Sequence, residues 1–230
     1  MIAATLPFDI QPLPLPADAP HDVRVWLVHI DLTAPLSVFD VLSEDELARA
    51  RRFLRHEDAA RFATVRSALR HVLAAETGGD PSALVLNPDP NGRPSLAQPD
   101  APDFNVSHSG AYGLIAISRA RRVGVDIEGA RASFDWRELE AAVLAEQDRR
   151  EIEAMPEASR SGGFFDCWTA KEAVLKAHGD GIGGAAIPMN GFAVLPRDGV
   201  RYALTRAAGA FAAVALAAPA GYAAALAWSL

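Results

Sequence analysis

Three short segments with alternating hydrophobic residues follow one another in the middle of this chain. They are FNVSHS at 104–109, YGLIAIS at 112–118 and VGVDIE at 123–128. Such alternation is typical of β-strands, because successive side chains point to opposite faces of a sheet. Only a glycine or a few basic turn residues separate the segments, which favours tight connections. We therefore expect a meander of adjacent strands at the centre of the fold.

Segments with helical spacing lie on both sides of these strands, at residues 46–54, 57–73, 135–155 and 164–179. Before the first segment, Ser43 and Glu46 have the spacing of a capping box. The second is expected to stop at Gly78, and residues 155–163 are expected to separate the last two. Strand-like segments also occur at 23–30 and after residue 192. The predicted fold class is therefore α+β.

The composition is that of an ordinary globular protein. Half of the 230 residues are hydrophobic, so the chain can bury a sizeable core. The net charge of −7 argues against general nucleic-acid binding by long-range attraction. Cys167 is the single cysteine, which excludes an intramolecular disulfide and a cysteine-based zinc site. A reducing cytoplasm is the expected location.

We expect no membrane segment at either end of the sequence. Residues 1–22 contain several prolines and lack the basic region of a signal peptide, which predicts an extended arm. Residues 207–228 carry no charge, but Pro219 and Gly221 interrupt them. Two strands, at 211–218 and 222–230, are therefore expected to form a hairpin instead of a membrane span.

Acidic residues on the last of the three central strands raise a functional question. Asp126 and Glu128 share one face of the strand VGVDIEG, while the valines and the isoleucine face the other side. On the helix that follows, Glu172 and Lys176 lie one turn apart. A solvated acidic edge strand would explain this pattern, and so would a Mg²⁺ site built from three carboxylates. The strand pattern alone leaves both interpretations open, and mutual repulsion of the two strand acids is expected.

Five motifs together resemble the signature of the 4′-phosphopantetheinyl transferases, of the larger surfactin-synthetase-activating type. They are ELARARRFLRHEDAARF at 46–62, NGRP at 91–94, FNVSHSG at 104–110, GVDIE at 124–128 and WTAKEAVLKAHGDG at 168–181. Each motif is weak alone, but their order and spacing are specific. The resemblance extends from about residue 23 to the end of the chain.

The resemblance implies a reaction and a set of reacting groups. Members of the family transfer the 4′-phosphopantetheine arm of coenzyme A to a serine of an apo acyl or peptidyl carrier protein, releasing adenosine 3′,5′-bisphosphate. By similarity, Asp126, Glu128 and Glu172 would hold Mg²⁺, with Mn²⁺ as a substitute. Glu172 is also the candidate general base. Lys176 would contact the diphosphate and stabilise charge in the transition state.

The same resemblance assigns residues to the nucleotide end of coenzyme A. Ser107 and His108 match positions that bind this end, and Arg49 and Arg52 match basic residues near its phosphates. Arg93 of NGRP replaces the commoner lysine and keeps the charge. A catalytic pair of Ser107 and His108 is rejected, since neighbouring strand residues point to opposite faces.

The fold implied by the resemblance is two similar α+β halves packed side by side as a pseudo-dimer in one monomeric chain. The expected parts are an arm at 1–22, a first half at 23–120 and a second half at 121–230, with coenzyme and metal at the junction. Two other functions are considered. A Mg²⁺-dependent nucleotide or diphosphate hydrolase would use the same carboxylates, and a non-catalytic module would only bind coenzyme A.

Overall fold

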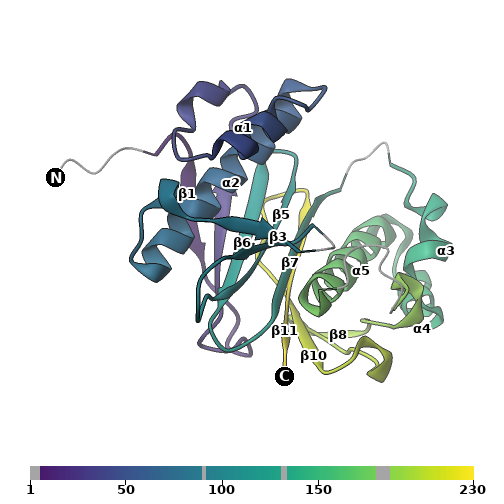
Figure 1. Cartoon of the computed structure of the whole chain (residues 1–230). Coiled ribbons are helices and arrows are strands. Elements are labelled where there is room, and N and C mark those ends of the chain that lie inside the picture. Colours follow the sequence, from purple (N-terminus) through teal and green to yellow (C-terminus); the bar gives the residue numbers. More distant parts are fainter. Residues whose placement is uncertain (1–5, 90–91, 131–133, 180–186) are drawn as a thin grey trace.

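Two β-sheets, each covered by a long helix on its outer face, form the body of the protein (Figure 1). The computed structural model describes residues 6–89, 92–130, 134–179 and 187–230. Residues 91 and 180–181 of the motifs above lie outside these ranges. One hydrophobic cluster joins the inner faces of the two sheets, and two further clusters join each sheet to its helix. The layers therefore run helix, sheet, sheet, helix.

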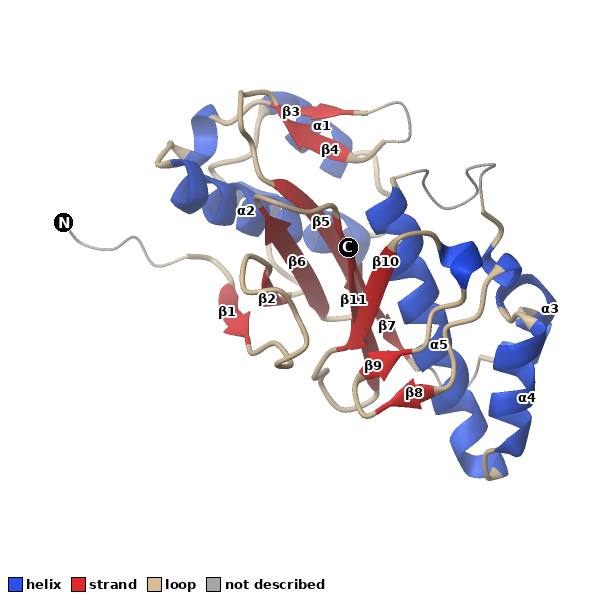
Figure 2. Ribbon diagram, turned by 90° about the horizontal axis from the view of Figure 1, so that it is seen from below, coloured by secondary structure: helices blue, strands red, loops and turns tan. Residues whose placement is uncertain are grey.

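The first sheet has four strands in the order β1-β2-β6-β5. Its strands are β1 (Asp9–Leu13), β2 (Arg24–His29), β5 (Asp103–Ser109) and β6 (Tyr112–Ser118). Two helices, α1 (Glu44–Ala50) and α2 (His56–Thr77), and a small ribbon of β3 (Leu86–Pro88) and β4 (Pro94–Leu96) complete this part. Valine and leucine side chains of α2 pack on the outer face of the sheet. Figure 2 shows from below how α2 lies against this sheet.

The second sheet has five strands in the order β7-β11-β10-β9-β8. They are β7 (Val123–Gly129), β8 (Arg197–Asp198), β9 (Arg201–Tyr202), β10 (Phe211–Ala215) and β11 (Tyr222–Ser229). The helices are α3 (Glu140–Val143), α4 (Glu146–Ala154) and α5 (Glu157–His178). Short 3₁₀ helices lie at Leu36–Val38, Pro81–Ala83, Trp136–Glu138, Met189–Gly191 and Arg206–Ala208. The predicted C-terminal hairpin is confirmed as β10 and β11.

The expected meander of three strands is wrong for its third member. β6 is hydrogen-bonded to β5 on one side and to β2 on the other, so it has no free edge for β7. β7 instead crosses to the second sheet and pairs with β11. The alternating pattern identified the strand correctly, but it carries no information about the partner.

Helix ends follow local sequence signals, with one correction. The capping box of Ser43 and Glu46 is present at the start of α1, and Gly78 ends α2 with a left-handed φ of 71°. The expected break at 155–163 is too long, because α5 already begins at Glu157, directly after Pro156. Proline has a fixed φ and no backbone N–H group, and at the N-cap neither property disturbs the helix that follows.

Part of the segment expected as an extended arm belongs to the first sheet. Residues Asp9–Leu13 pair with β2 along their full length, so this segment forms an edge strand. In the described part of the chain, no helix is long and apolar enough to span a membrane.

Helix α5 approaches β7 so closely that a glycine is required between them. A Cβ atom added at Gly124 would overlap the backbone of Ala173 and Ala177. On the opposite face of β7, Val123, Val125 and Ile127 are fully buried in the core between the sheets. The strand is thus held on both faces, which fixes the positions of its acidic residues.

We expect Gly124→Ala to destabilise the protein by about 3 kcal/mol or more, because backbone atoms cannot move aside as flexible side chains do. Urea unfolding of parent and variant measures the change. Gly162→Ala is the matched control, since Gly162 lies on α5 with open space around its Cα. That change should stabilise by up to about 1 kcal/mol through helix propensity. Equal stability of the parent and Gly124→Ala would contradict the close contact.

Candidate active site

The edge strands of the two sheets meet through side chains instead of a backbone ladder. Alternate residues of β5 accept hydrogen bonds from alternate backbone N–H groups of β7. The pairs are Asp103 with Val123 (2.7 Å), Asn105 with Val125 (3.0 Å), Ser107 with Ile127 (3.4 Å) and Ser109 with Gly129 (3.1 Å). This side-chain ladder satisfies N–H groups that the edge of β7 would otherwise leave unpaired.

The same serines hold the two acids of β7. Ser107 Oγ donates to Asp126 Oδ1 at 2.7 Å, and Ser109 Oγ donates to Glu128 Oε2 at 3.0 Å. Lys176 Nζ from α5 lies 2.6 Å from the same oxygen of Asp126. The repulsion expected between the strand acids is therefore offset at Asp126 by a buried ion pair.

Glu172 projects from α5 into the same region and is only 5% exposed. Its Oε1 accepts a hydrogen bond from Trp168 Nε1 at 3.3 Å, while its Oε2 is buried without a partner. Desolvation raises the pKa of Glu172 to about 7; Lys176 opposes this shift, and the charge of Asp126 adds to it. A carboxyl group with such a pKa can exchange a proton near neutral pH.

Lys176 is the cation of this cluster. Burial disfavours its charge, but the charges of Asp126 and Glu172 outweigh this effect, and the pKa of Lys176 is raised. The ammonium group also lies 3.2 Å from Ser107 Oγ. Its charge is therefore present throughout the physiological pH range.

The carboxylate oxygens fit a hard divalent cation in chemistry. Asp126 Oδ2 and Glu172 Oε2 are buried oxygens without hydrogen-bond partners, which a cation would satisfy. Among the described residues, however, no group of three or more His, Cys, Asp or Glu side chains is arranged as a metal site. Metal binding by Asp126, Glu128 and Glu172 therefore stays a prediction.

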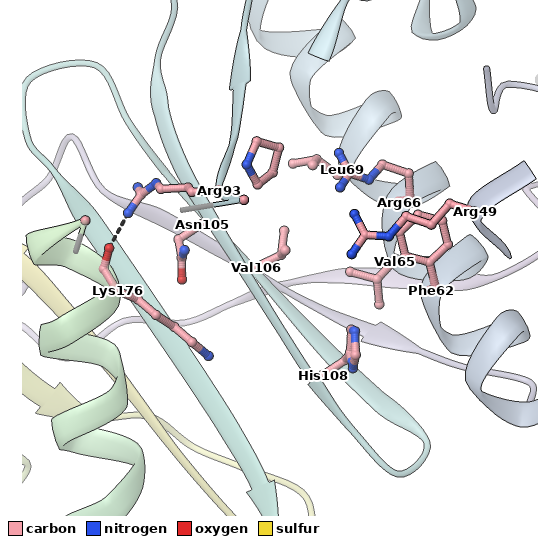
Figure 3. A pocket seen from close by; sticks show the side chains of 13 residues that line it. Arg49, Phe62, Val65, Arg66, Leu69, Arg93, Asn105, Val106, His108 and Lys176 are labelled. Carbon is pink, nitrogen blue, oxygen red and sulfur yellow. Dashed lines mark hydrogen bonds between the residues drawn. The ribbon is translucent and has the colours of Figure 1, made fainter. Parts of the chain in front are cut away.

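A cavity of about 270 Å³ opens beside these groups, between the two halves. Figure 3 shows His108 of β5 and Lys176 of α5 facing it from one side and Arg49 and Arg66 from the other. The two guanidinium groups lie 5.0 and 5.7 Å from the ring centre of Phe62. These four cationic or protonatable side chains, with Arg93 as a fifth on the cavity wall, favour an anionic ligand.

Of the residues expected to bind the nucleotide end, His108 lines this cavity, whereas Ser107 and Arg52 do not. The His108 ring is exposed to the cavity; desolvation by the cavity walls and then the charge of Arg61 lower its pKa. Ser107 points to the opposite face of β5, where it binds Asp126. Arg52 lines a neighbouring cavity that shares Arg49 with the first one.

Arg93 lines the cavity but directs its guanidinium group to protein acceptors. It donates to Asp103 at 2.7 Å, to the Phe104 carbonyl at 2.8 Å and to the Val123 carbonyl at 3.0 Å. A further bond reaches the carbonyl of Lys176, drawn as the dashed line in Figure 3. The expected phosphate contact would require Arg93 to give up bonds that hold the two halves together.

Arg66 and Phe62 are site residues that the sequence interpretation missed. Both come from α2, one turn apart, and both line the cavity. The carboxylate of Glu46 lies 2.7 Å from Arg70 Nε and 3.7 Å from Arg66 Nε. Their spacing of four residues places Phe62 and Arg66 on one side of a helix, which the sequence alone could have indicated. Several other arginines between residues 49 and 70 have a similar spacing, so the spacing does not single out Arg66.

Lys171 and Cys167, both on α5, have structural roles. Lys171 is fully buried, forms an ion pair of 2.7 Å with Asp148 and donates to the carbonyls of Met189 and Phe192. Burial raises the pKa of the Cys167 thiol well above its usual value, so this thiol is not activated. Neither side chain faces the cavity.

Two family models match the chain, one for each half. The model of the 4′-phosphopantetheinyl transferase superfamily matches residues 122–227, and the model of the 4′-phosphopantetheinyl transferase N-terminal region matches residues 33–120. The boundary between the matches falls between β6 and β7, where the chain passes from the first sheet to the second.

Curated relatives give the same result. A Synechocystis protein is 37% identical over 70% of this chain and 66% of its own length. It is provisionally named a 4′-phosphopantetheinyl transferase. The 4′-phosphopantetheinyl transferase HetI of Nostoc is 34% identical over 70% of each chain. Sfp of Bacillus subtilis, also named a 4′-phosphopantetheinyl transferase, is 27% identical over 69% of this chain and 68% of its own.

The chain thus matches its relatives over about two thirds of their length. Both halves of the fold match models that carry the same family name. The motifs of the sequence meet at one junction, where an acidic cluster adjoins a cationic cavity. This protein belongs to the 4′-phosphopantetheinyl transferase superfamily.

Proposed function

We propose that this protein transfers the 4′-phosphopantetheine arm of coenzyme A to a serine of an apo acyl or peptidyl carrier protein. The observation that carries the proposal is the meeting of Lys176 with Asp126 and Glu172 at the edge of a cationic cavity. The reaction takes place at the diphosphate of coenzyme A. There a cation is needed to stabilise the phosphoryl oxygens, and a carboxylate is needed to accept the serine proton. The other product would be adenosine 3′,5′-bisphosphate.

The cavity suits the nucleotide end of coenzyme A. Arg49, Arg66 and His108 can donate to the 3′-phosphate, and the guanidinium groups already carry full charge. Lys176 lies between this cavity and Asp126, where the diphosphate would follow the nucleotide. The order of groups along the junction thus matches the order of groups along coenzyme A.

The reaction is a displacement at phosphorus. The carrier serine oxygen forms a bond to the phosphorus next to pantetheine, and the bond from that phosphorus to the bridging oxygen of the bisphosphate breaks. Glu172 would accept the serine proton; its unpaired Oε2 and its pKa of about 7 support this role. Lys176 stabilises the charge that develops on the phosphoryl oxygens. A magnesium or manganese ion held by Asp126, Glu128 and Glu172 would supply further neutralisation of the diphosphate.

Intact-mass measurement tests the proposal against the two other functions. The protein is incubated with coenzyme A, Mg²⁺ and a panel of apo carrier proteins from different pathways. A carrier that gains the mass of phosphopantetheine supports transfer. Coenzyme A cleaved without a modified carrier would indicate a hydrolase, and intact coenzyme A that is bound but not consumed would indicate a binding module.

Lys176→Met should reduce transfer by about 100-fold or more, because it removes an electrostatic donor to the transition state at nearly constant side-chain length. Initial rates of carrier modification measure the effect. Thermal melts and far-ultraviolet circular dichroism establish that the variant is folded. Turnover within about threefold of the parent in a folded variant would contradict the role of Lys176.

His108→Ala should weaken binding of coenzyme A by about 10-fold, since a donor to the 3′-phosphate is lost. Dephospho-coenzyme A lacks that phosphate and serves as the internal control. Calorimetric titration of parent and variant with both ligands gives four dissociation constants. Equal losses for the two ligands would place His108 away from the 3′-phosphate.

Glu172→Gln should stabilise the protein in chelator at pH 8. The folded-state pKa of about 7 lies above the usual value of 4.5, so the protonated form stabilises the fold at low pH. That contribution is lost progressively as the pH rises from about 4.5 to about 7, at about 1.4 kcal/mol per pKa unit. The parent should therefore become less stable than the variant between pH 5 and 8, by up to about 3 kcal/mol in urea melts. A pH-independent difference would contradict the buried, unpaired carboxyl group.

A further inference from the structure

Ser109 has no role in the proposed reaction, yet its bonds repeat those of Ser107. The two serines lie two residues apart on β5, so their side chains point to the same side. Each accepts a hydrogen bond from a backbone N–H of β7 and donates one to an acid of β7. Two consecutive positions of the side-chain ladder thus carry the same arrangement.

The chemistry of a hydroxyl group makes this arrangement directional. A serine hydroxyl has one hydrogen to donate and lone pairs that accept. Because the lone pairs of Ser109 Oγ receive the N–H of Gly129 at 3.1 Å, its hydrogen is directed to Glu128 Oε2 at 3.0 Å. The backbone of β7 therefore orients the serine, and the serine orients the carboxylate.

Glu128 has more to gain from such a bond than Asp126. Asp126 has a shorter side chain and is only 2% exposed. Glu128 has one more rotatable bond and is half-buried at the end of the strand. A hydroxyl that holds one oxygen of Glu128 reduces the number of conformations in which the other oxygen can face the junction.

We propose that Ser109 is a positioning residue that orients Glu128 for a divalent cation at the junction. This inference rests on the metal site of the proposed function. Hydrogen bonds to a ligand carboxylate commonly contribute 10- to 100-fold to metal affinity. The first half of the fold would thereby determine how well an acid of the second half binds a cation.

The test is Mn²⁺ binding, measured by calorimetry first with the metal alone and then with saturating coenzyme A. Ser109→Ala should raise the dissociation constant for Mn²⁺ by 10- to 100-fold. Ser109→Thr keeps the hydroxyl and should bind within about threefold of the parent. Glu128→Gln should weaken binding at least as much as Ser109→Ala.

Ser118→Ala is the matched structural control. Ser118 is a fully buried serine that donates to a carboxylate, Asp22, at 2.5 Å and accepts the backbone N–H of Arg121 at 2.9 Å. Its replacement removes the same kinds of bond away from the acidic cluster. It should lower the melting temperature about as much as Ser109→Ala does, but it should leave Mn²⁺ affinity unchanged.

The possible outcomes separate the inference from the proposed function. Parent-like Mn²⁺ affinity in Ser109→Ala, with weakened binding in Glu128→Gln, would overturn the inference and leave the metal site in place. Equal weakening in Ser109→Ala and Ser118→Ala would also overturn it, because loss of stability alone would then explain both. Absence of Mn²⁺ binding by the parent under both conditions would overturn the metal site and the inference together.

Discussion

Backbone N–H groups at the edge of β7 must be satisfied without a neighbouring strand, and the side chains of β5 satisfy them. A buried, unpaired N–H costs about as much as a lost hydrogen bond, so four such groups in a row would strongly disfavour this junction. Asp103, Asn105, Ser107 and Ser109 remove that cost. These side chains take the place of a backbone ladder, and the two serines also hold the carboxylates of Asp126 and Glu128.

Much of the local structure and the chemical character of the site could be predicted from the sequence. The capping box at Ser43, the stop at Gly78 and the C-terminal hairpin depend on neighbouring residues, and all three are present. The partner of β7 could not be predicted, since it depends on which edges are already occupied. The hydrogen bonds of Arg93 could not be predicted for a related reason. Their acceptors include backbone carbonyl groups, which every residue has, so the sequence does not identify them.

Charge at the junction is balanced unevenly. Asp126 and Glu172 each keep one buried oxygen without a hydrogen-bond partner, but the other oxygen of Asp126 has an ammonium and a hydroxyl partner, whereas that of Glu172 has only the indole N–H of Trp168. Removing water from an ionised carboxylate is costly unless another charge replaces it. The fold therefore retains a group that is unfavourable by itself, as is common where a site is preorganised for a ligand or a reaction.

The link between the two halves has a kinetic consequence. Only residues 119–122 connect the end of β6 with the start of β7, while the core between the sheets draws side chains from both. A connector of this length holds the two halves at an effective concentration far above that of the protein in a cell. Exchange of halves between two molecules would have to separate this core first. The short connector therefore favours assembly of the junction between the two halves of a single chain, as soon as the second half has been synthesised.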